Sequence, residues 1–307
     1  MAAEFKKTRG IVFDFKRYAL HDGPGIRASV HFKGCPLACL WCHNPESQIF
    51  EPRPLFRPER CIGCGACVGA CPKGAVRASE AGLLTDETLC AGLGRCADAC
   101  PSGAREMCGK SVGVDEVTHQ ILKERLFFEQ SGGGVTLTGG EPLSQPEFAI
   151  AILRECKKYE LHTTLDTSGF ASPSVIMETI PHTDLFLYDI KIMNPDRHRE
   201  FTGVDNEIIL SNLSKLASAG AEIWARMPFI PGINTDLENL NAAGKFISGL
   251  NAVRQLNILP YHSAAEDKHN RWGIKFGLKG LRPPTEQSLR SAAKIIESFG
   301  VKVLIGG

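Results

Sequence analysis

The sequence predicts an α/β fold, a partial barrel of six strand–helix units, a (β/α)6 arrangement, interrupted near its start by a small cysteine-rich insertion. From residue 135 onward, short apolar runs alternate with helical patterns, which is typical of βαβ units and a parallel sheet. Eleven of the twelve cysteines lie between Cys35 and Cys108. The same stretch, from about residue 51, is rich in Gly and Pro and has no long apolar period.

The first predicted strand, residues 28–32, precedes the cysteine region. The other predicted strands cover 135–138, 162–165, 185–188, 222–226 and 255–259, and clear helical patterns cover 146–160, 206–219 and 237–250. Six such units fit a partial barrel better than an eight-unit one. A last apolar run at 301–305 either extends the sheet at one edge or forms a terminal tail.

Three segments follow from this pattern. Residues 1–50 start the barrel and carry a first group of cysteines, 51–110 form the insertion, and 111–307 complete the barrel. Without a long apolar period, the insertion cannot build a core from side chains alone, so metal ligation would supply the missing folding free energy.

Composition excludes several classes of protein. The 35 basic and 34 acidic side chains are mixed along 307 residues and leave a net charge of +1, so we expect no binding to nucleic acid or to an anionic membrane. Residues 1–10 lack an apolar signal segment, and no later run approaches the roughly 20 apolar residues of a membrane span. We therefore expect a cytoplasmic protein, in which closely spaced cysteines bind metal more often than they form disulfides.

The first group of cysteines has the spacing C-x3-C-x2-C and follows the first predicted strand, at Cys35, Cys39 and Cys42. A 4Fe–4S cluster takes four ligands, so three thiolates leave one iron open to a substrate. The alternative is a zinc site completed by His43. Because His43 follows Cys42 directly, it can hardly join the same tetrahedron without strain.

The second group reproduces the bacterial ferredoxin run C-x2-C-x2-C-x3-C-P at Cys61, Cys64, Cys67, Cys71 and Pro72. In such runs the fourth cysteine binds the other cluster. The sequence therefore predicts a ferredoxin-like domain with two clusters, one held by Cys61, Cys64, Cys67 and Cys100 and the other by Cys71, Cys90 and Cys96.

The second run departs from the ferredoxin pattern. Five residues separate Cys90 from Cys96, and Leu93 occupies the middle ligand position. Cys108 is the nearest spare thiol, and we expect it to be the fourth ligand. A non-cysteine ligand or an incomplete cluster stays open as an alternative.

With Trp41 inside its last gap, the first group resembles the radical S-adenosylmethionine (SAM) superfamily. Over nearly its whole length the chain resembles the glycyl radical enzyme activating enzymes, through motifs at 21–27, 41–46, 131–134, 138–142, 166–169, 189–191, 226–232 and 259–262. The resemblance implies an oxidoreductase. Its reduced cluster would cleave SAM to methionine and a 5′-deoxyadenosyl radical, which takes a hydrogen atom from a glycine of a partner enzyme.

Most of these motifs lie at the carboxyl ends of predicted strands, where ligand sites of parallel α/β folds collect. The resemblance gives catalytic roles to Cys35, Cys39, Cys42 and Lys191. It gives the SAM site Trp41, Cys42, His43, Gly139, Gly140, Glu141, Asp166, Ser168, Asp189, Ile190, Lys191 and His262. Gly139 and Gly140 would lie by the SAM amino group, Lys191 by its carboxylate, and His262 by its ribose or adenine.

Asp166 and Asp189 end successive predicted strands. Two carboxylates facing one pocket repel unless Lys191 or a cation lies between them, and the resemblance implies a monovalent ion there. The alternative that both acids only cap the helices that follow stays open.

The resemblance also implies three 4Fe–4S clusters, a glycyl radical enzyme as protein substrate, reduced flavodoxin or ferredoxin as electron donor, and a monomer. Asp22 and Arg27 would touch the glycine-bearing segment of the partner. Two alternatives are a radical SAM enzyme acting on a small molecule or another peptide, and a ferredoxin-type electron carrier. The carrier would not need the roughly 200 residues outside the insertion. The sequence does not identify the cognate partner.

Overall fold

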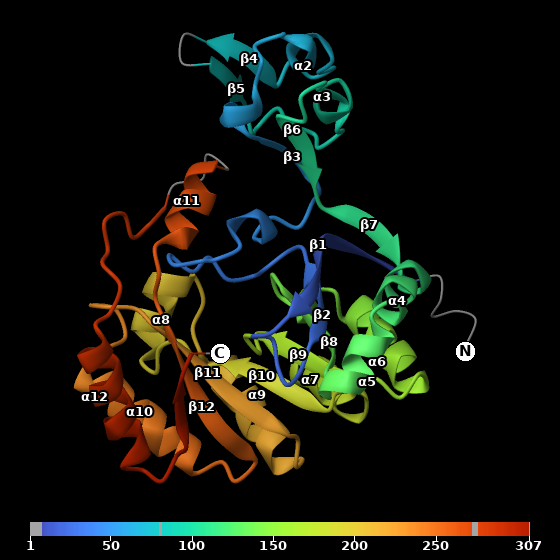
Figure 1. The fold of residues 1–307 in the computed structure, drawn as a ribbon. Coiled ribbons are helices and arrows are strands. Elements are labelled where there is room, and N and C mark those ends of the chain that lie inside the picture. The colour runs from blue at the N-terminus through green and yellow to red at the C-terminus, as the bar shows by residue number, and fades with distance from the viewer. Residues whose placement is uncertain (1–7, 80–81, 272–275, 307) are drawn as a thin grey trace.

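The computed structural model describes residues 8–79, 82–271 and 276–306, and its centre is a curved sheet of nine strands (Figure 1). The strand order is β13–β12–β11–β10–β9–β8–β2–β1–β7. All six predicted strands are present, as β2 (Arg27–Phe32), β8 (Gly134–Gly139), β9 (His162–Thr167), β10 (Leu185–Asp189), β11 (Ile223–Phe229) and β12 (Val253–Pro260). They run parallel in one order, so the predicted fold class is confirmed.

Three further strands widen the sheet. The unassigned run near the C-terminus is β13 (Val303–Ile305), which pairs in parallel with β12. At the other edge, β1 (Arg9–Ala19) and β7 (Lys110–Gly113) are antiparallel and were not predicted. Irregular registers between Val12 and Asp14 and between Lys16 and Ala19 break the alternation of β1, and β7 has only four residues, so neither carries a clear period of two.

Most helices pack on the outer face of the sheet (Figure 1). These are α4 (Val114–Leu122), α5 (Arg125–Ser131), α6 (Pro146–Lys158), α7 (Pro173–Thr179), α9 (Glu207–Ser218), α10 (Leu237–Ser248) and α12 (Glu286–Glu297). Helices α8 (Pro195–Thr202) and α11 (Ala264–Arg271) lie instead beyond the carboxyl ends of the strands, against the loop that follows β2. Short 3-10 turns lie at Pro45–Ser47, Pro58–Arg60, Pro142–Ser144 and Ile180–His182. The three predicted helices are α6, α9 and α10. None of the helices in the described ranges combines the length and apolarity needed to cross a membrane.

Alternation along the strands separates an apolar face from a polar one. Phe32 of β2 packs on Phe148 of α6, within a large apolar cluster between sheet and helices. On the opposite face, the hydroxyl of Thr138 in β8 donates to Asp166 of β9 over 2.6 Å. The concave side of the sheet therefore carries the polar groups, and it is there that a site can form.

The insertion projects from the sheet beyond the N-terminal edge strands (Figure 1). Its first strand, β3 (Arg53–Phe56), pairs antiparallel with its last, β6 (Arg105–Cys108). Between them lie α2 (Ala66–Gly69), β4 (Val76–Ser79), β5 (Gly82–Thr85) and α3 (Arg95–Asp98). Among its described residues, the buried apolar cluster consists of Cys67, Val76 and Cys96, which agrees with a segment that depends on metal ligation for stability.

Candidate active site

A cavity of about 510 Å³ opens at the carboxyl ends of the parallel strands, the edge where such folds bind ligands. Its walls come from the loop after β2 and from the ends of β8 to β12. The predicted site residues that line it are Asp22, Cys35, Cys39, Trp41, Cys42, His43, Gly139, Gly140, Asp166, Ser168, Asp189, Lys191 and His262. The structure thus brings together side chains that are up to 240 residues apart in the sequence.

The loop with the first three cysteines is held by α8 and by its own turn. The backbone amide of Ala38 donates to Thr202 O over 2.7 Å, and that of Leu40 donates to Phe201 O over 3.1 Å. Trp41 is buried in a small apolar cluster that includes Ile230. The three thiols therefore sit on a fixed loop, and Trp41 anchors it.

Burial raises the pKa of Cys35 and Cys39 to about 12 and that of Cys42 to about 11. Metal binding must displace these protons. Among the described residues, no three His, Cys, Asp or Glu side chains converge closely enough to hold one metal ion. An iron–sulfur cluster presents separate irons to its ligands, so thiols that do not converge on one point can still bind one cluster.

Helix α11 covers the end of this loop, a contact that the sequence analysis missed. Lys268 Nζ lies 2.9 Å from Asn44 Oδ1 and 2.7 Å from Glu46 Oε1. His269 Nε2 lies 3.0 Å from Cys42 O. Residues more than 200 positions away thereby fix the backbone next to Cys42, and no sequence spacing could have indicated it.

The charged wall of the cavity is built from two acids and two bases. Lys191 Nζ lies 2.6 Å from Asp189 Oδ2, and Arg226 bridges Asp166 and Asp189 at 3.4 and 3.5 Å. The sequence predicted Lys191 or a cation between the acids. The structure places Arg226 there, a residue of a recognised motif that had been given no role.

Burial and these contacts change the pKa values of the charged side chains in this wall. Burial raises the pKa of Asp166 to about 6. Although burial opposes it, contact with Lys191 and Arg226 holds the pKa of Asp189 below its ordinary value. Likewise, Asp189 raises the pKa of Lys191 despite burial. The wall therefore keeps both bases charged, and Asp166 is its most easily protonated acid.

Two predicted SAM-site residues do not reach the cavity surface. Glu141 is buried and accepts hydrogen bonds from Thr167 Oγ1 at 2.7 Å and from Ser168 N at 2.8 Å. Ile190 is buried in the apolar cluster between sheet and helices. In this structure Glu141 positions Ser168, which does line the cavity, and Ile190 is a core residue.

Gly139 and Gly140 line the cavity, but the space that they leave free is filled by the neighbouring strand. A Cβ on Gly139, whose φ is +107°, would lie 2.7 Å from Phe32 N, and one on Gly140 would lie 2.3 Å from Gly34 O. The glycines are therefore required for the close approach of β2 and β8, independently of any ligand.

The two predicted partner contacts differ. Asp22 lines the cavity, whereas Arg27 is fully buried. The Arg27 guanidinium donates to Thr136 Oγ1, Val135 O and Thr164 Oγ1 at 2.6 to 2.8 Å. The expectation that Arg27 touches a partner is corrected by this burial, because its hydrogen bonds hold β2, β8 and β9 together.

In the insertion, the cysteines form two groups. Cys61, Cys64, Cys67 and Cys100 line one small void, and Cys71, Cys90 and Cys96 line another. Cys108 does not join the second group, because its thiol faces Glu46 O, 3.7 Å away, at the base of the insertion. The expectation that Cys108 completes that group is thus corrected: β6 carries it toward the barrel.

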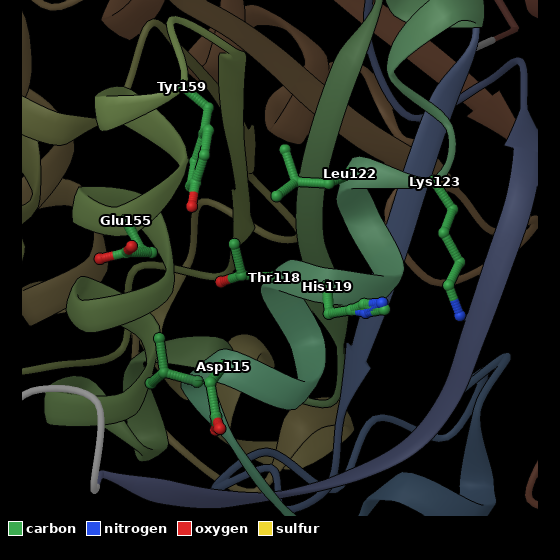
Figure 2. A pocket seen from close by; sticks show the side chains of 8 residues that line it. Asp115, Thr118, His119, Leu122, Lys123, Glu155 and Tyr159 are labelled. Atoms are coloured by element: carbon green, nitrogen blue, oxygen red, sulfur yellow. The ribbon is translucent and has the colours of Figure 1, made fainter.

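A groove of about 400 Å³ lies on the outer face between α4 and α6. Figure 2 shows Thr118 of α4 on the side of Glu155 in α6 and of Tyr159 just beyond it, whereas the ring of His119 points away, toward the side of Lys123. None of the predicted site residues lines this groove, so the described chemistry stays in the cavity at the strand ends.

Comparison with known proteins identifies both parts of the chain. Residues 98–241 match the family model of the radical SAM superfamily, and residues 60–104 match that of the 4Fe-4S dicluster domain. A domain of pyruvate-formate lyase-activating enzyme from Bacteroides vulgatus is 33% identical, with a TM-score of 0.50 over 57% of this chain and all of that one.

Two relatives match almost from end to end. The trans-4-hydroxy-L-proline dehydratase activating enzyme of Clostridioides difficile is 41% identical over 97% of this chain and 99% of its own length. The choline trimethylamine-lyase activating enzyme of Oleidesulfovibrio alaskensis is 36% identical over 97% and 98%. With its thiols, cavity and insertion in agreement with these matches, the chain belongs to the glycyl radical enzyme activating enzymes of the radical SAM superfamily, which cleave SAM to form a radical on a glycine of a partner enzyme.

Proposed function

We propose that SAM binds in the cavity at the strand ends, between the thiols of Cys35, Cys39 and Cys42 and the charged wall formed by Lys191 and Arg226. The observation that carries this proposal is that the three thiols and both bases border one space of about 510 Å³. SAM has a carboxylate, an amino group and a sulfonium, and this space offers partners for each kind of group.

Different residues of the cavity contact different parts of SAM in this proposal. Lys191 binds the carboxylate, the ends of β8 at Gly139 and Gly140 border the amino group, and His262 contacts the adenosine. His262 is already fixed by His43, with ring centroids 4.4 Å apart. When bound, the reduced cluster and SAM together supply a carbon-centred radical able to take hydrogen from a glycine. The chain itself orients SAM and excludes competing reactions.

A monovalent cation near the acids is part of the proposal. Asp22, Asp166 and Asp189 line the cavity with Lys191 and Arg226. Three carboxylates against two bases leave one negative charge when all are ionised, which a single monovalent ion would balance.

We propose that residues 51–110 form a ferredoxin-type domain with two clusters, giving three in the whole chain, and that reduced flavodoxin or ferredoxin supplies the electrons. The two groups of cysteines in the insertion support this loading. The insertion has little apolar core of its own, so cluster loading and folding should be coupled there.

The protein substrate is a glycyl radical enzyme, whose glycine segment enters the cavity beside Asp22. The relatives named above activate enzymes of different chemistry at 41% and 36% identity, and this narrow spread does not select one partner. We further propose that the chain works as a monomer in the cytoplasm, with no nucleic acid or membrane as a partner.

The test is to mix the reconstituted protein, SAM, a reductant and the glycyl radical enzyme from the neighbouring gene without oxygen. A glycyl doublet in the electron paramagnetic resonance (EPR) spectrum, with stoichiometric 5′-deoxyadenosine, is expected. A glycine-to-alanine change in the partner should remove the doublet. If 5′-deoxyadenosine forms but a small metabolite is modified and no protein radical appears, the small-molecule alternative replaces this proposal.

A further inference from the structure

The insertion contains an internal structural repeat offset by 29 residues. Helix α2 after Cys64 corresponds to α3 after Leu93, and each is preceded by two glycines with left-handed φ angles. These are +71° and +70° at Gly63 and Gly65, and +65° and +75° at Gly92 and Gly94. The repeat therefore puts Leu93 at the same backbone position as Cys64.

The spacing of the cysteines agrees with this correspondence, because Cys61, Cys67 and Cys71 match Cys90, Cys96 and Cys100 at the same offset. The thiols of Cys71 and Cys100 each accept a hydrogen bond from a backbone amide just after them, Ala75 N and Arg105 N, both at 3.3 Å, although these two donors differ by one position in the repeat. The void beside Cys61 is lined by four thiols, whereas the void beside Cys90 is lined by three. The two sites thus share their backbone and differ in one ligand.

Nothing on the described lining of the second void replaces the missing thiol. Apart from three cysteines, its lining consists of apolar residues, glycines, Lys73 and Arg95. Leu93 is 57% exposed and has no donor atom. Neither a carboxylate nor an imidazole lines this void, and Cys108 faces Glu46 instead.

We propose that the second insertion site binds its 4Fe–4S cluster through Cys71, Cys90 and Cys96 only, so that one iron has no protein ligand. This inference rests on the proposed loading of three clusters. The open iron would be held by a solvent-derived ligand, in a setting made positive by Lys73 and Arg95.

Such an iron is lost on oxidation. Ferricyanide takes one electron from the 2+ cluster and becomes ferrocyanide; the resulting 3+ cluster releases Fe²⁺ and leaves a 3Fe–4S cluster of charge 1+. A site with four thiolates holds every iron and resists this loss. The two insertion sites should therefore respond differently to the same oxidant.

The experiment uses the full chain with Cys35→Ala, Cys39→Ala and Cys42→Ala, because the barrel cluster also has three thiolates and would add its own signal. Reconstituted protein is treated anaerobically with ferricyanide, and three-iron spins are counted by EPR. We expect about one such spin per chain, and the same in the control Leu93→Ala. Leu93→Cys should abolish the signal.

The repeat also allows the reciprocal substitution to serve as a control. Cys64→Leu removes the equivalent ligand from the first site and should raise the count to about two spins per chain. Combining it with Leu93→Cys should bring the count back to about one. If Leu93→Cys fails to assemble, the increase in Cys64→Leu still tests whether loss of this ligand creates an oxidisable site.

Iron analysis before oxidation separates the two proposals. About eight irons per chain in the background variant supports loading of both insertion sites, and about four overturns the three-cluster proposal itself. Full iron with no three-iron signal, or with a signal that Leu93→Cys leaves unchanged in an assembled protein, overturns the three-thiolate assignment alone.

Discussion

Two sites in this molecule offer three thiols each, and they stand in opposite surroundings. In the barrel, Cys35, Cys39 and Cys42 border a cavity of about 510 Å³ with charged walls. In the insertion, the group at Cys71, Cys90 and Cys96 borders a void of about 20 Å³ lined otherwise by apolar residues, glycines, Lys73 and Arg95. An open iron can therefore arise in both places, but only the first has room for SAM. In both sites, three thiols would leave one iron without a protein ligand. The residues that line each space then determine which external ligand can bind that iron.

The largest difference between the two sites is expected when the barrel thiols are removed. Cys42→Ala should lower reductive SAM cleavage by at least ~10³-fold, since among the described residues Cys35, Cys39 and Cys42 are the thiols that border the proposed SAM site. Cys90→Ala should spare a single cleavage driven by dithionite and impair multiple turnovers. The measurement is 5′-deoxyadenosine formed per chain, in one turnover and in many.

Cys156→Ala is the matched control, because this thiol is fully buried in the apolar cluster of the barrel and binds no predicted cluster. It should cost about 1 kcal/mol of stability and leave cleavage unchanged. Equal loss of single-turnover cleavage in Cys42→Ala and Cys90→Ala would show that the two sites do not divide the work.

The next largest effect is expected from a substitution in the charged wall of the barrel cavity that leaves its three thiols in place. Lys191→Met should weaken SAM binding by ~30-fold or more, because truncating one partner of a buried charge pair costs about 2–5 kcal/mol. The cluster itself should assemble normally. Equilibrium dialysis of SAM and EPR of the reduced cluster measure the two separately.

Lys158→Met, at an exposed position on α6, removes the same charge far from the cavity and should change neither readout. Unchanged SAM affinity in Lys191→Met would remove Lys191 from the proposed site.

Much of the fold could be predicted because its signals are local. Apolar runs alternating with helical periods are visible in any short window, and they gave all six parallel strands. The edge strand β1 was missed because its irregular register hides the alternation. Likewise, spacing alone predicted which cysteines of the ferredoxin run border a common void, whereas it did not predict the place of Cys108. It is near in sequence, but β6 turns its thiol to Glu46.

Site residues could be predicted where a motif lies at the end of a single strand. They could not be predicted where their position depends on the packing of separate strands or helices. Arg226 faces the acids because its strand pairs in register with β10, with Arg226 beside Asp189. That register is a tertiary property. The contacts of α11 with the cysteine loop depend in the same way on packing between distant segments.

A smaller effect is expected from a residue that acts on the cavity only through a neighbour. Glu141→Gln replaces an acceptor with a donor facing Ser168 N and Oγ, both now within 2.8 Å. We expect a loss of about 1–3 kcal/mol in the free energy of unfolding and a several-fold rise in KM for SAM with clusters intact. Glu147→Gln, exposed on α6, is the control. A stability loss without any change in KM would limit Glu141 to a structural role.

The smallest expected effect is a pH dependence that belongs to the barrel cavity. Burial raises the pKa of Asp166 to about 6, above its ordinary 3.8. The folded state therefore holds this proton more tightly than the unfolded state does, so the contribution of Asp166 to stability falls as pH rises from about 4 to 6 and is flat above. Asparagine cannot ionise. Between pH 5 and 7.5, the stability of Asp166→Asn relative to the unsubstituted protein should thus improve by about 1–1.5 kcal/mol.

Unfolding in denaturant at pH 5 and pH 7.5 measures the stability of Asp166→Asn relative to the unsubstituted protein. A substitution of a second acid, Asp184, is the control. Although burial opposes it, the hydrogen bond from Lys157 holds the pKa of Asp184 below 3.8, so Asp184→Asn should show no change across the same window. A flat difference for Asp166→Asn as well would mean that Arg226 neutralises Asp166 as fully as Lys191 and Arg226 neutralise Asp189. The cavity would then have no readily protonated acid, and the excess negative charge assigned to a monovalent ion would persist down to pH 5.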